Sequence, residues 1–144
     1  MSSSAGELVL AFDFGTRRIG VAIGETLLKT ARPLTTIDAP DNARRFDTIG
    51  RLIAEWQPAC LVVGLPLALD GAEHEMTARS RRFANQLHGR FGLPVEFADE
   101  RLSSSVAEGR LAARGAKPSR NKAAIDAEAA AVILQTWFDR TVHA

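Results

Sequence analysis

The sequence predicts an α/β protein built on a mixed five-stranded sheet, with three antiparallel strands extended by two parallel strands and flanked by helices. Three observations lead to this fold class. The chain has 144 residues, of which 46% are hydrophobic and 24% charged, so it can bury one compact core. Short, turn-like connections join its first three apolar segments, which is typical of antiparallel neighbours. Its later apolar runs alternate with helical patterns, which indicates parallel strands joined by crossovers.

The first part of the chain predicts three strands. Residues 8–14 form a continuous apolar run that is closed by a glycine, as expected for a buried strand that ends at a turn. Residues 19–23 form a second short strand, and the tripeptide 15–17 between the two is about the length of a hairpin connection. Residues 27–37 form a looser extended segment. Because Pro33 cannot donate a backbone hydrogen bond, this third strand is expected at an edge of the sheet.

The middle of the chain alternates helix and strand. Residues 38–42 form a turn cluster that supplies an N-cap for a helix over 43–56, where apolar residues recur at helical spacing. The apolar run 60–65 follows this helix, which indicates a crossover into a central parallel strand. A long helix over 73–91 and a fifth short strand over 95–98 come next.

The last part of the chain predicts two helices. The first is capped by Ser103 or Ser104 and ends at Arg114, and the second is the alanine-rich segment 123–138. The complete order is three strands, a helix, a strand, a helix, a strand and two helices. This is the element order of the ribonuclease H-like fold.

The chain is expected to form a single domain in the cytoplasm. Residues 1–7 are predicted to be a loose tail without the features of a secretory signal, and residues 8–140 form the domain. Cys60 is the lone cysteine and cannot form an internal disulfide, which fits a reducing compartment. No apolar run approaches the roughly 20 residues that span a bilayer, so a membrane partner is not expected.

Three acidic residues occupy positions where a carboxylate needs a partner. Asp13 lies within an apolar strand, Glu100 follows the last predicted strand, and Asp126 begins the last helix. Taken alone, each has an ordinary explanation. Asp13 could cap a turn, Glu100 could form a salt bridge, and Asp126 would occupy a position that the helix dipole favours. All three could converge if the last helix packs across the sheet. Carboxylate oxygens suit Mg²⁺ or Mn²⁺, and two such ions support hydrolysis of phosphodiester bonds.

Two other acids compete for this role. Asp99 directly precedes Glu100, but a continued strand would place Glu100 on the face of Ala98 and Asp99 on the opposite face. This alternation favours Glu100 as the site residue. Asp70 precedes a glycine, and a simple turn explains that dipeptide.

Positive charge is local rather than global. The chain has 18 Lys and Arg against 17 Asp and Glu, so its net charge of +1 gives no general argument for nucleic acid. Arg17, Arg18 and Arg101 lie beside the predicted carboxylates and are candidates for binding a substrate phosphate. Lys122 ends a basic stretch over 110–122 that contains no acid. This stretch could hold phosphates near the metal ions, or it could be an ordinary solvated loop.

Other chemistries lack their residues in this sequence. The histidines have no matching serine or cysteine signature for a nucleophilic triad. There is no phosphate-binding loop with its lysine, and the glycines near the N-terminus do not have the spacing of a dinucleotide fingerprint.

Four motifs resemble those of the YqgF (RuvX) family. They come in the order of the family and extend over nearly the whole chain. The motifs are FDFGTRRIGVA at 12–22, VVGLPL at 62–67 with DG at 70–71, DERL at 99–102, and Lys122 followed by ID at 125–126, AA at 129–130 and ILQ at 133–135.

This resemblance implies a ribonuclease H-like fold related to the bacterial Holliday-junction resolvase RuvC. It also implies a nuclease that matures the 5′ end of the small-subunit (16S) ribosomal RNA precursor. The acidic residues of the family correspond here to Asp13, Glu100 and Asp126. The chain departs from the family pattern at residues 24–25, where Gly-Glu replaces a common Ser-Asp. At 103–105, serines replace common threonines and keep the hydroxyl groups.

We therefore expect a metal-dependent endonuclease that acts on structured RNA, as a monomer or homodimer, with ribosomal RNA precursor and the ribosome as partners. Asp13, Glu100 and Asp126 would bind Mg²⁺ or Mn²⁺, and Arg17, Arg18, Arg101 and Lys122 would bind the substrate. Three alternatives stay open. They are cleavage of branched DNA, a non-catalytic protein that binds RNA or the transcription machinery, and an actin-like phosphotransferase, which the short length argues against.

Overall fold

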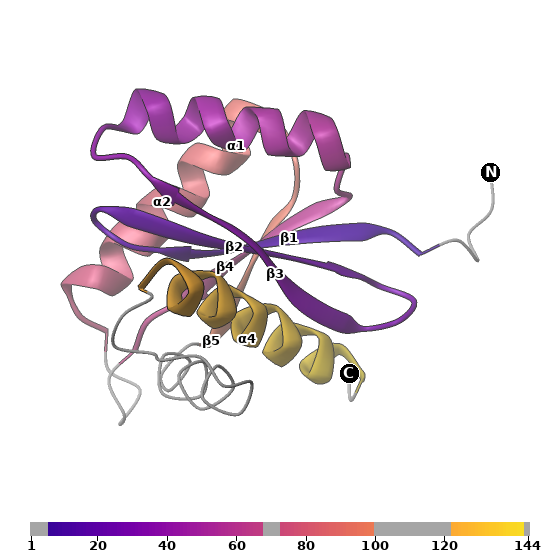
Figure 1. Ribbon diagram of the computed structural model, residues 1–144. Helices are drawn as coiled ribbons and strands as arrows, with labels where there is room; N and C mark the ends of the chain where they lie inside the picture. The colour runs from indigo at the N-terminus through magenta and orange to yellow at the C-terminus, as the bar shows by residue number, and fades with distance from the viewer. Residues whose placement is uncertain (1–5, 68–72, 100–121, 143–144) are drawn as a thin grey trace.

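The computed structural model describes residues 6–67, 73–99 and 122–142 (Figure 1). Five strands form one sheet in the order β3-β2-β1-β4-β5. The first three strands are antiparallel neighbours, whereas β4 pairs parallel to β1 and β5 pairs parallel to β4. The predicted mixed sheet is thereby confirmed. Its strands are β1 (Leu8–Phe14), β2 (Arg18–Glu25), β3 (Thr30–Asp38), β4 (Cys60–Leu65) and β5 (Val95–Asp99).

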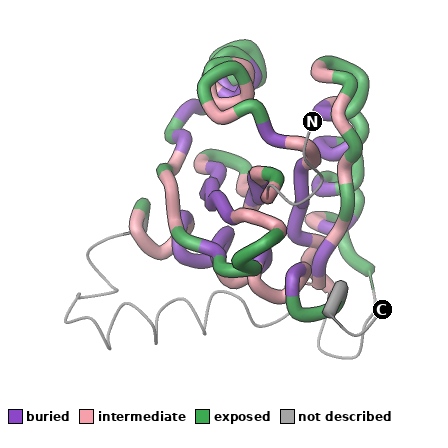
Figure 2. The backbone as a smooth tube through the Cα atoms, turned by 90° about the vertical axis from the view of Figure 1, so that its right-hand side faces the viewer, coloured by how far each residue is buried: buried purple, intermediate pink, exposed green. Residues whose placement is uncertain are grey.

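Helices cover both faces of this sheet. Helix α1 (Asn42–Trp56) and helix α2 (Glu75–Phe91) pack on one face, and helix α4 (Lys122–Val142) packs on the other (Figure 1). The two faces carry separate hydrophobic clusters, so the sheet is buried on both sides. Figure 2 shows buried positions concentrated along the strands and exposed positions on the outer sides of the helices.

Strand β1 explains why a continuous apolar run is needed at the centre of the sheet. Its side chains alternate between the two faces. Leu10 and Phe12 join the cluster under α1 and α2, whereas Val9 and Ala11 join the cluster under α4. All four are fully buried. A strand covered on both faces cannot alternate polar and apolar residues, so it appears in the sequence as an unbroken apolar run.

The helices begin where the sequence supplies a cap. Asp41 is the N-cap of α1 and accepts a hydrogen bond from the backbone N–H of Arg44 at 2.9 Å, as the turn cluster predicted. His74 is the N-cap of α2, where its side chain and that of Thr77 form a reciprocal capping box. Helix α2 ends at Gly92, whose φ of 68° is the left-handed conformation that glycine adopts readily.

The third strand is shorter than the sequence predicted. The extended segment expected over 27–37 is a strand only from Thr30, because Leu27 and Leu28 lie in the turn between β2 and β3. Both leucines are exposed, at 64% and 71%. The expected position of this strand at an edge of the sheet is confirmed. The helix predicted to end at Arg114 lies outside the described residues.

The described part of the chain contains no helix that is both long enough and apolar enough to cross a bilayer.

Candidate active site

Asp13 and Gly20 define the centre of the site. Asp13 is the penultimate residue of β1 and pairs with Gly20 on β2. Directly opposed residues of antiparallel strands project to the same face of a sheet. Since Val9 and Ala11 face α4, the alternation places Asp13 on the face that α4 covers.

Helix α4 approaches the sheet very closely at Gly20. A Cβ atom built on Gly20 would lie 1.9 Å from the backbone oxygen of Asp126 and 3.0 Å from the backbone nitrogen of Ala127. No side chain fits in this space, so the glycine allows the first turns of α4 to rest directly on β2. The backbone of Asp126 is therefore held beside the strand position opposite Asp13. The structure thus brings two of the three predicted carboxylates to one face and one end of the sheet.

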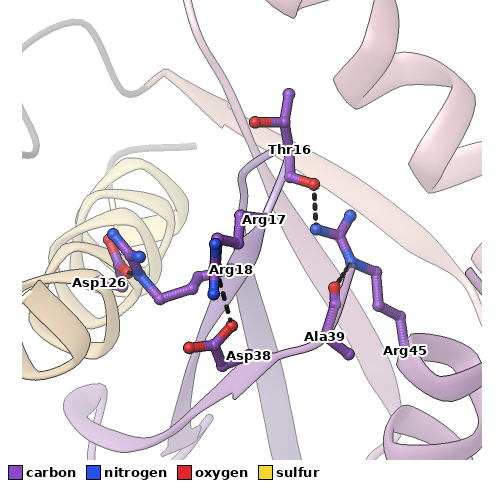
Figure 3. Close-up of polar contacts among 7 residues, drawn as sticks. All are labelled: Thr16, Arg17, Arg18, Asp38, Ala39, Arg45 and Asp126. Carbon is purple, nitrogen blue, oxygen red and sulfur yellow. Dashed lines mark hydrogen bonds and ion pairs between the residues drawn. The ribbon is translucent and has the colours of Figure 1, made fainter. Parts of the chain in front are cut away.

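Arg18 connects β2 to Asp126. Its Nε donates a hydrogen bond to Oδ2 of Asp126 at 2.6 Å, across 108 residues of sequence (Figure 3). The two side chains are only 28% and 26% exposed. This hydrogen bond and the charge of Asp126 raise the pKa of Arg18 above its ordinary value. Arg18, predicted to bind substrate, is thus paired with a predicted metal ligand.

Three further hydrogen bonds, made by two side chains, fix α4 on the sheet. Thr36 on β3 donates its hydroxyl hydrogen bond to the backbone oxygen of Ala123 at 2.5 Å, near the start of the helix. Gln135 holds the later part of the helix, because its amide accepts from the backbone N–H of Ala31 at 3.1 Å and donates to the carbonyl of Lys29 at 2.9 Å. Asp126 is therefore positioned by a helix that is anchored on both sides of it.

Arg17 is in a different environment from Arg18. Its Nε lies 3.4 Å from Oδ1 of Asp38, and the two side chains are 76% and 56% exposed. Such an exposed ion pair contributes little to stability, so the guanidinium can exchange partners at little cost. Figure 3 shows Arg17 and Asp38 beside the Arg18–Asp126 pair.

Arg45 supports the connection between β1 and β2, a role that was not predicted from the sequence. It is 3% exposed, its Nε donates to the carbonyl of Ala39 at 2.6 Å, and its terminal nitrogen donates to the carbonyl of Thr16 (Figure 3). Burial lowers the pKa of this guanidinium from its ordinary value. One signal was available in the sequence. Position 45 lies four residues before Ile49, on the apolar face of the helix.

Four predicted site features fall outside the described residues. These are Glu100, Arg101, Asp70 and the side chain of Lys122, although the backbone of α4 begins at Lys122. The alternation along β5 places the competing acid Asp99. Ala98 belongs to the cluster under α4, and Phe97 belongs to the cluster on the other face. By the same alternation, Asp99 lies on the face away from Asp13 and Asp126.

The donor set fits a hard divalent cation. Among the described residues, no group of three His, Cys, Asp or Glu side chains could hold a metal ion. Asp13 and Asp126 are the two predicted ligands that lie within the described residues, and the third predicted ligand is Glu100. Carboxylate oxygens without sulfur or imidazole are the ligands that Mg²⁺ and Mn²⁺ prefer.

Cysteine and histidine do not contribute to this site in the described residues. Cys60 starts β4 and is half-buried, and burial raises the pKa of its thiol to about 11, so it is protonated at neutral pH. His74 caps α2, and His88 contacts the carbonyl of Leu93 at 3.0 Å through Nδ1. These roles are structural.

Comparisons with known proteins identify relatives over almost the full chain. A protein of Dechloromonas aromatica is 57% identical over 135 residues, which cover 94% of this chain and 92% of the relative. A protein of Chromobacterium violaceum is 56% identical over 132 residues, covering 91% and 96%. Both are provisionally named pre-16S rRNA nuclease.

Solved structures show the same fold at low sequence identity. Thermus thermophilus RuvC in complex with a Holliday junction aligns with a TM-score of 0.55 and 14% identity, over 94% of this chain and 96% of the other. The fowlpox virus resolvase, solved with Holliday junction DNA, aligns with a TM-score of 0.60 and 9% identity, over 94% and 99%. The ribonuclease H-like fold predicted from the element order is thereby confirmed.

Residues 7–140 match the family RuvX, which is described as Holliday junction resolvase. This match covers the five strands, α1, α2 and α4 as far as residue 140, including the strand with Asp13 and the helix turn with Asp126. Together with the identity to the two bacterial relatives, it shows that the chain belongs to the RuvX family.

Proposed function

We propose that this chain is a metal-dependent endonuclease that cleaves phosphodiester bonds in structured RNA and processes the 5′ end of pre-16S rRNA. The observation that carries the proposal is the approach of α4 to β2 at Gly20, which brings Asp126 to the face of Asp13. The names of the two relatives support the choice of substrate. Such a nuclease would work in the cytoplasm on precursor ribosomal particles.

Each residue has a distinct task in this proposal. Asp13, Asp126 and Glu100 hold Mg²⁺ or Mn²⁺, as two ions. When bound, the ions supply an activated water and neutralise negative charge on the phosphate. Arg18 orients the carboxylate of Asp126 through its hydrogen bond at 2.6 Å.

The remaining basic residues act on the substrate. Arg17 is exposed and held only by a long contact to Asp38, so it can turn to a phosphate of the substrate. Arg101 and Lys122 are assigned the same task by their place in the sequence, next to Glu100 and before Asp126. Phosphate contacts of this kind position a nucleic acid and make its binding sensitive to salt.

Replacement of Asp13 by asparagine tests the proposal. Asp13→Asn keeps the shape of the side chain and removes its charge. Cleavage of a precursor RNA in Mn²⁺ should fall about 100-fold or more, because the ions supply several kcal/mol and about 1.4 kcal/mol corresponds to tenfold in rate. The matched control is Asp47→Asn on α1, an exposed carboxylate paired with Arg51. Cleavage by a folded Asp13→Asn variant at the parental rate would contradict the proposal.

Branched DNA is a second candidate substrate, favoured by the family description and by the two structures with Holliday junctions. Four-way DNA junctions and precursor RNA should be compared in one assay with the same Mn²⁺ concentration. Faster cleavage of the junctions would indicate that branched DNA, not RNA, is the substrate. Binding of RNA without cleavage of either substrate would indicate a non-catalytic binding protein.

A further inference from the structure

A polar cavity lies on the side of the sheet opposite the two carboxylates. It has a volume of about 330 Å³ and is bounded by α1, α2 and the connection between β1 and β2. Three of its residues are arginines, and others offer hydroxyl or amide groups. The polar lining residues are Thr16, Asn42, Arg45, Arg79, Arg82 and Gln86.

The charge in this cavity is positive. No acidic side chain of the described residues lines it. Arg79 forms an ion pair with Glu75 at 2.5 Å, but Arg82 has no ion pair within the described part of the chain. Arg45 is 3% exposed and is fixed by the carbonyls of Ala39 and Thr16. The cavity thus combines an immobilised guanidinium in its wall with an exposed one that can reach a ligand.

The connection between β1 and β2 links the cavity to the candidate active site along the chain. Phe14 and Thr16 line the cavity. Asp13 and Arg18, at the two ends of this connection, face α4 on the other side. Figure 3 shows Arg18 with Asp126 on one side of this connection and Arg45 on the other. A strand of nucleic acid that passes over the connection would therefore meet both sites.

The donor set favours a phosphate group as the ligand. Guanidinium groups form paired, charge-assisted hydrogen bonds with phosphate oxygens, and hydroxyl and amide side chains add further donors. We propose that this cavity binds a backbone phosphate of the substrate strand, on the other side of the β1–β2 connection from the bond that the carboxylate site cleaves. The assignment rests on the proposed nuclease function and extends it by a second point of contact. Arg79 and Arg82, which lie on a helix face, thereby gain a binding role.

Binding of RNA at several salt concentrations tests this assignment separately from cleavage. The probe is a labelled RNA that spans the 5′ boundary of 16S rRNA, with Ca²⁺ in place of Mg²⁺. Arg82→Gln should weaken binding and reduce the slope of log K against log salt by about 0.7 to 0.9, the value for one lost phosphate contact. The control is Arg51→Gln on α1, which removes one charge from an arginine that is 78% exposed and lies outside the cavity.

Inorganic phosphate provides a second, independent readout. In the parent chain, titration with phosphate should shift the amide NMR signals of Thr16 and Gln86, and Arg82→Gln should weaken these shifts. If RNA binds the parent and Arg82→Gln leaves the slope unchanged, the assignment is overturned while the nuclease proposal stands. If phosphate binds but RNA affinity does not depend on Arg82, the cavity is a site for free anions only. If the parent neither binds nor cleaves RNA, both proposals fail.

Discussion

Arg18 and a metal ion would share one carboxylate. Arg18 donates to Oδ2 of Asp126 at 2.6 Å in a partly buried setting, so a cation at Asp126 has to compete with a guanidinium that is already there. This arrangement orients the carboxylate before a metal arrives. It also makes the affinity for metal depend on a residue that need not touch the metal.

Removal of Arg18 is expected to strengthen metal binding and weaken catalysis. Arg18→Gln should raise the affinity for Mn²⁺ about fivefold, because an ion pair of this kind contributes about 1 kcal/mol. Calorimetry or the electron paramagnetic resonance signal of free Mn²⁺ measures this. Arg17→Gln is the matched control, since the exposed pair with Asp38 lies at 3.4 Å and should leave the affinity unchanged. Weaker Mn²⁺ binding in Arg18→Gln would refute the competition.

Arg45 is expected to contribute to stability more than any exposed arginine of α1. Arg45→Met should lower the free energy of unfolding by about 1–3 kcal/mol, because the carbonyls of Thr16 and Ala39 lose their donor in a buried place. Arg44→Met, at a side chain 78% exposed, should change it by less than about 0.5 kcal/mol. Urea denaturation compares the two variants, and equal effects would show that the Arg45 contacts contribute nothing measurable.

At the scale of elements, the contact between β2 and α4 determines the site. Gly20, Ala22 and Gly24 alternate along the side of β2 that faces α4, and a Cβ on Gly24 would lie 2.6 Å from the ring of Phe138. The helix can therefore lie close along the strand. Because Asp126 is part of that helix, the packing of the two elements sets the position of a catalytic candidate.

A methyl group at Gly20 is expected to separate the two elements. Gly20→Ala places Cβ against a backbone oxygen, which cannot move aside as the end of a side chain can. We expect the unfolding free energy to fall by about 1–3 kcal/mol. We also expect the cleavage rate of the folded variant to fall, because Asp126 moves with the helix. Gly89→Ala on α2 is the control, because its Cβ meets nothing within 4 Å. That variant should be stabilised by about 0.5–1 kcal/mol with unchanged cleavage. Equal cleavage by both variants would show that α4 can move without consequence.

The sequence predicted most elements because their patterns are local. Strand β1 and strand β4 were predicted with the bounds 8–14 and 60–65 that the structure has, since central parallel strands are continuous apolar runs. At residues 27–29, in contrast, the local pattern was misleading. Leu27 and Leu28 extend the apolar pattern, but the chain turns there, and Lys29 adopts a φ of 54°. Hydrophobicity alone does not distinguish such a turn from the start of a strand.

At the scale of the whole molecule, the sequence predicted which residues form the site but not how they are arranged. Asp13 and Asp126 could be identified because acids are costly inside an apolar strand and because a covering helix can bring them together. The pairing of Arg18 with Asp126 depends on packing between segments 108 residues apart, which periodicity does not encode. Glu100, Arg101 and the side chain of Lys122 stay predictions.

The glycines of β2 could have predicted the close approach of α4 to the strand. Gly20 and Gly24 interrupt a strand of otherwise buried apolar residues, and glycine in such a strand often marks the close approach of another backbone. Arg45 likewise broke the apolar face of α1. In both cases the residue that violates the local pattern is the one that serves the arrangement of the whole molecule.

The outer edge of β3 bears on how the chain avoids aggregation. Edge strands attract further strands through their unpaired N–H groups. Here the N–H of Ala31 donates a hydrogen bond to the side chain of Gln135, and Pro33 has no N–H. The β2–β3 register also shifts between Val21 and Ala22. Since Gln135 belongs to the last helix, ribosomes synthesise β3 well before the residue that caps it. In the growing chain, the N–H of Ala31 therefore stays uncovered until Gln135 has been synthesised.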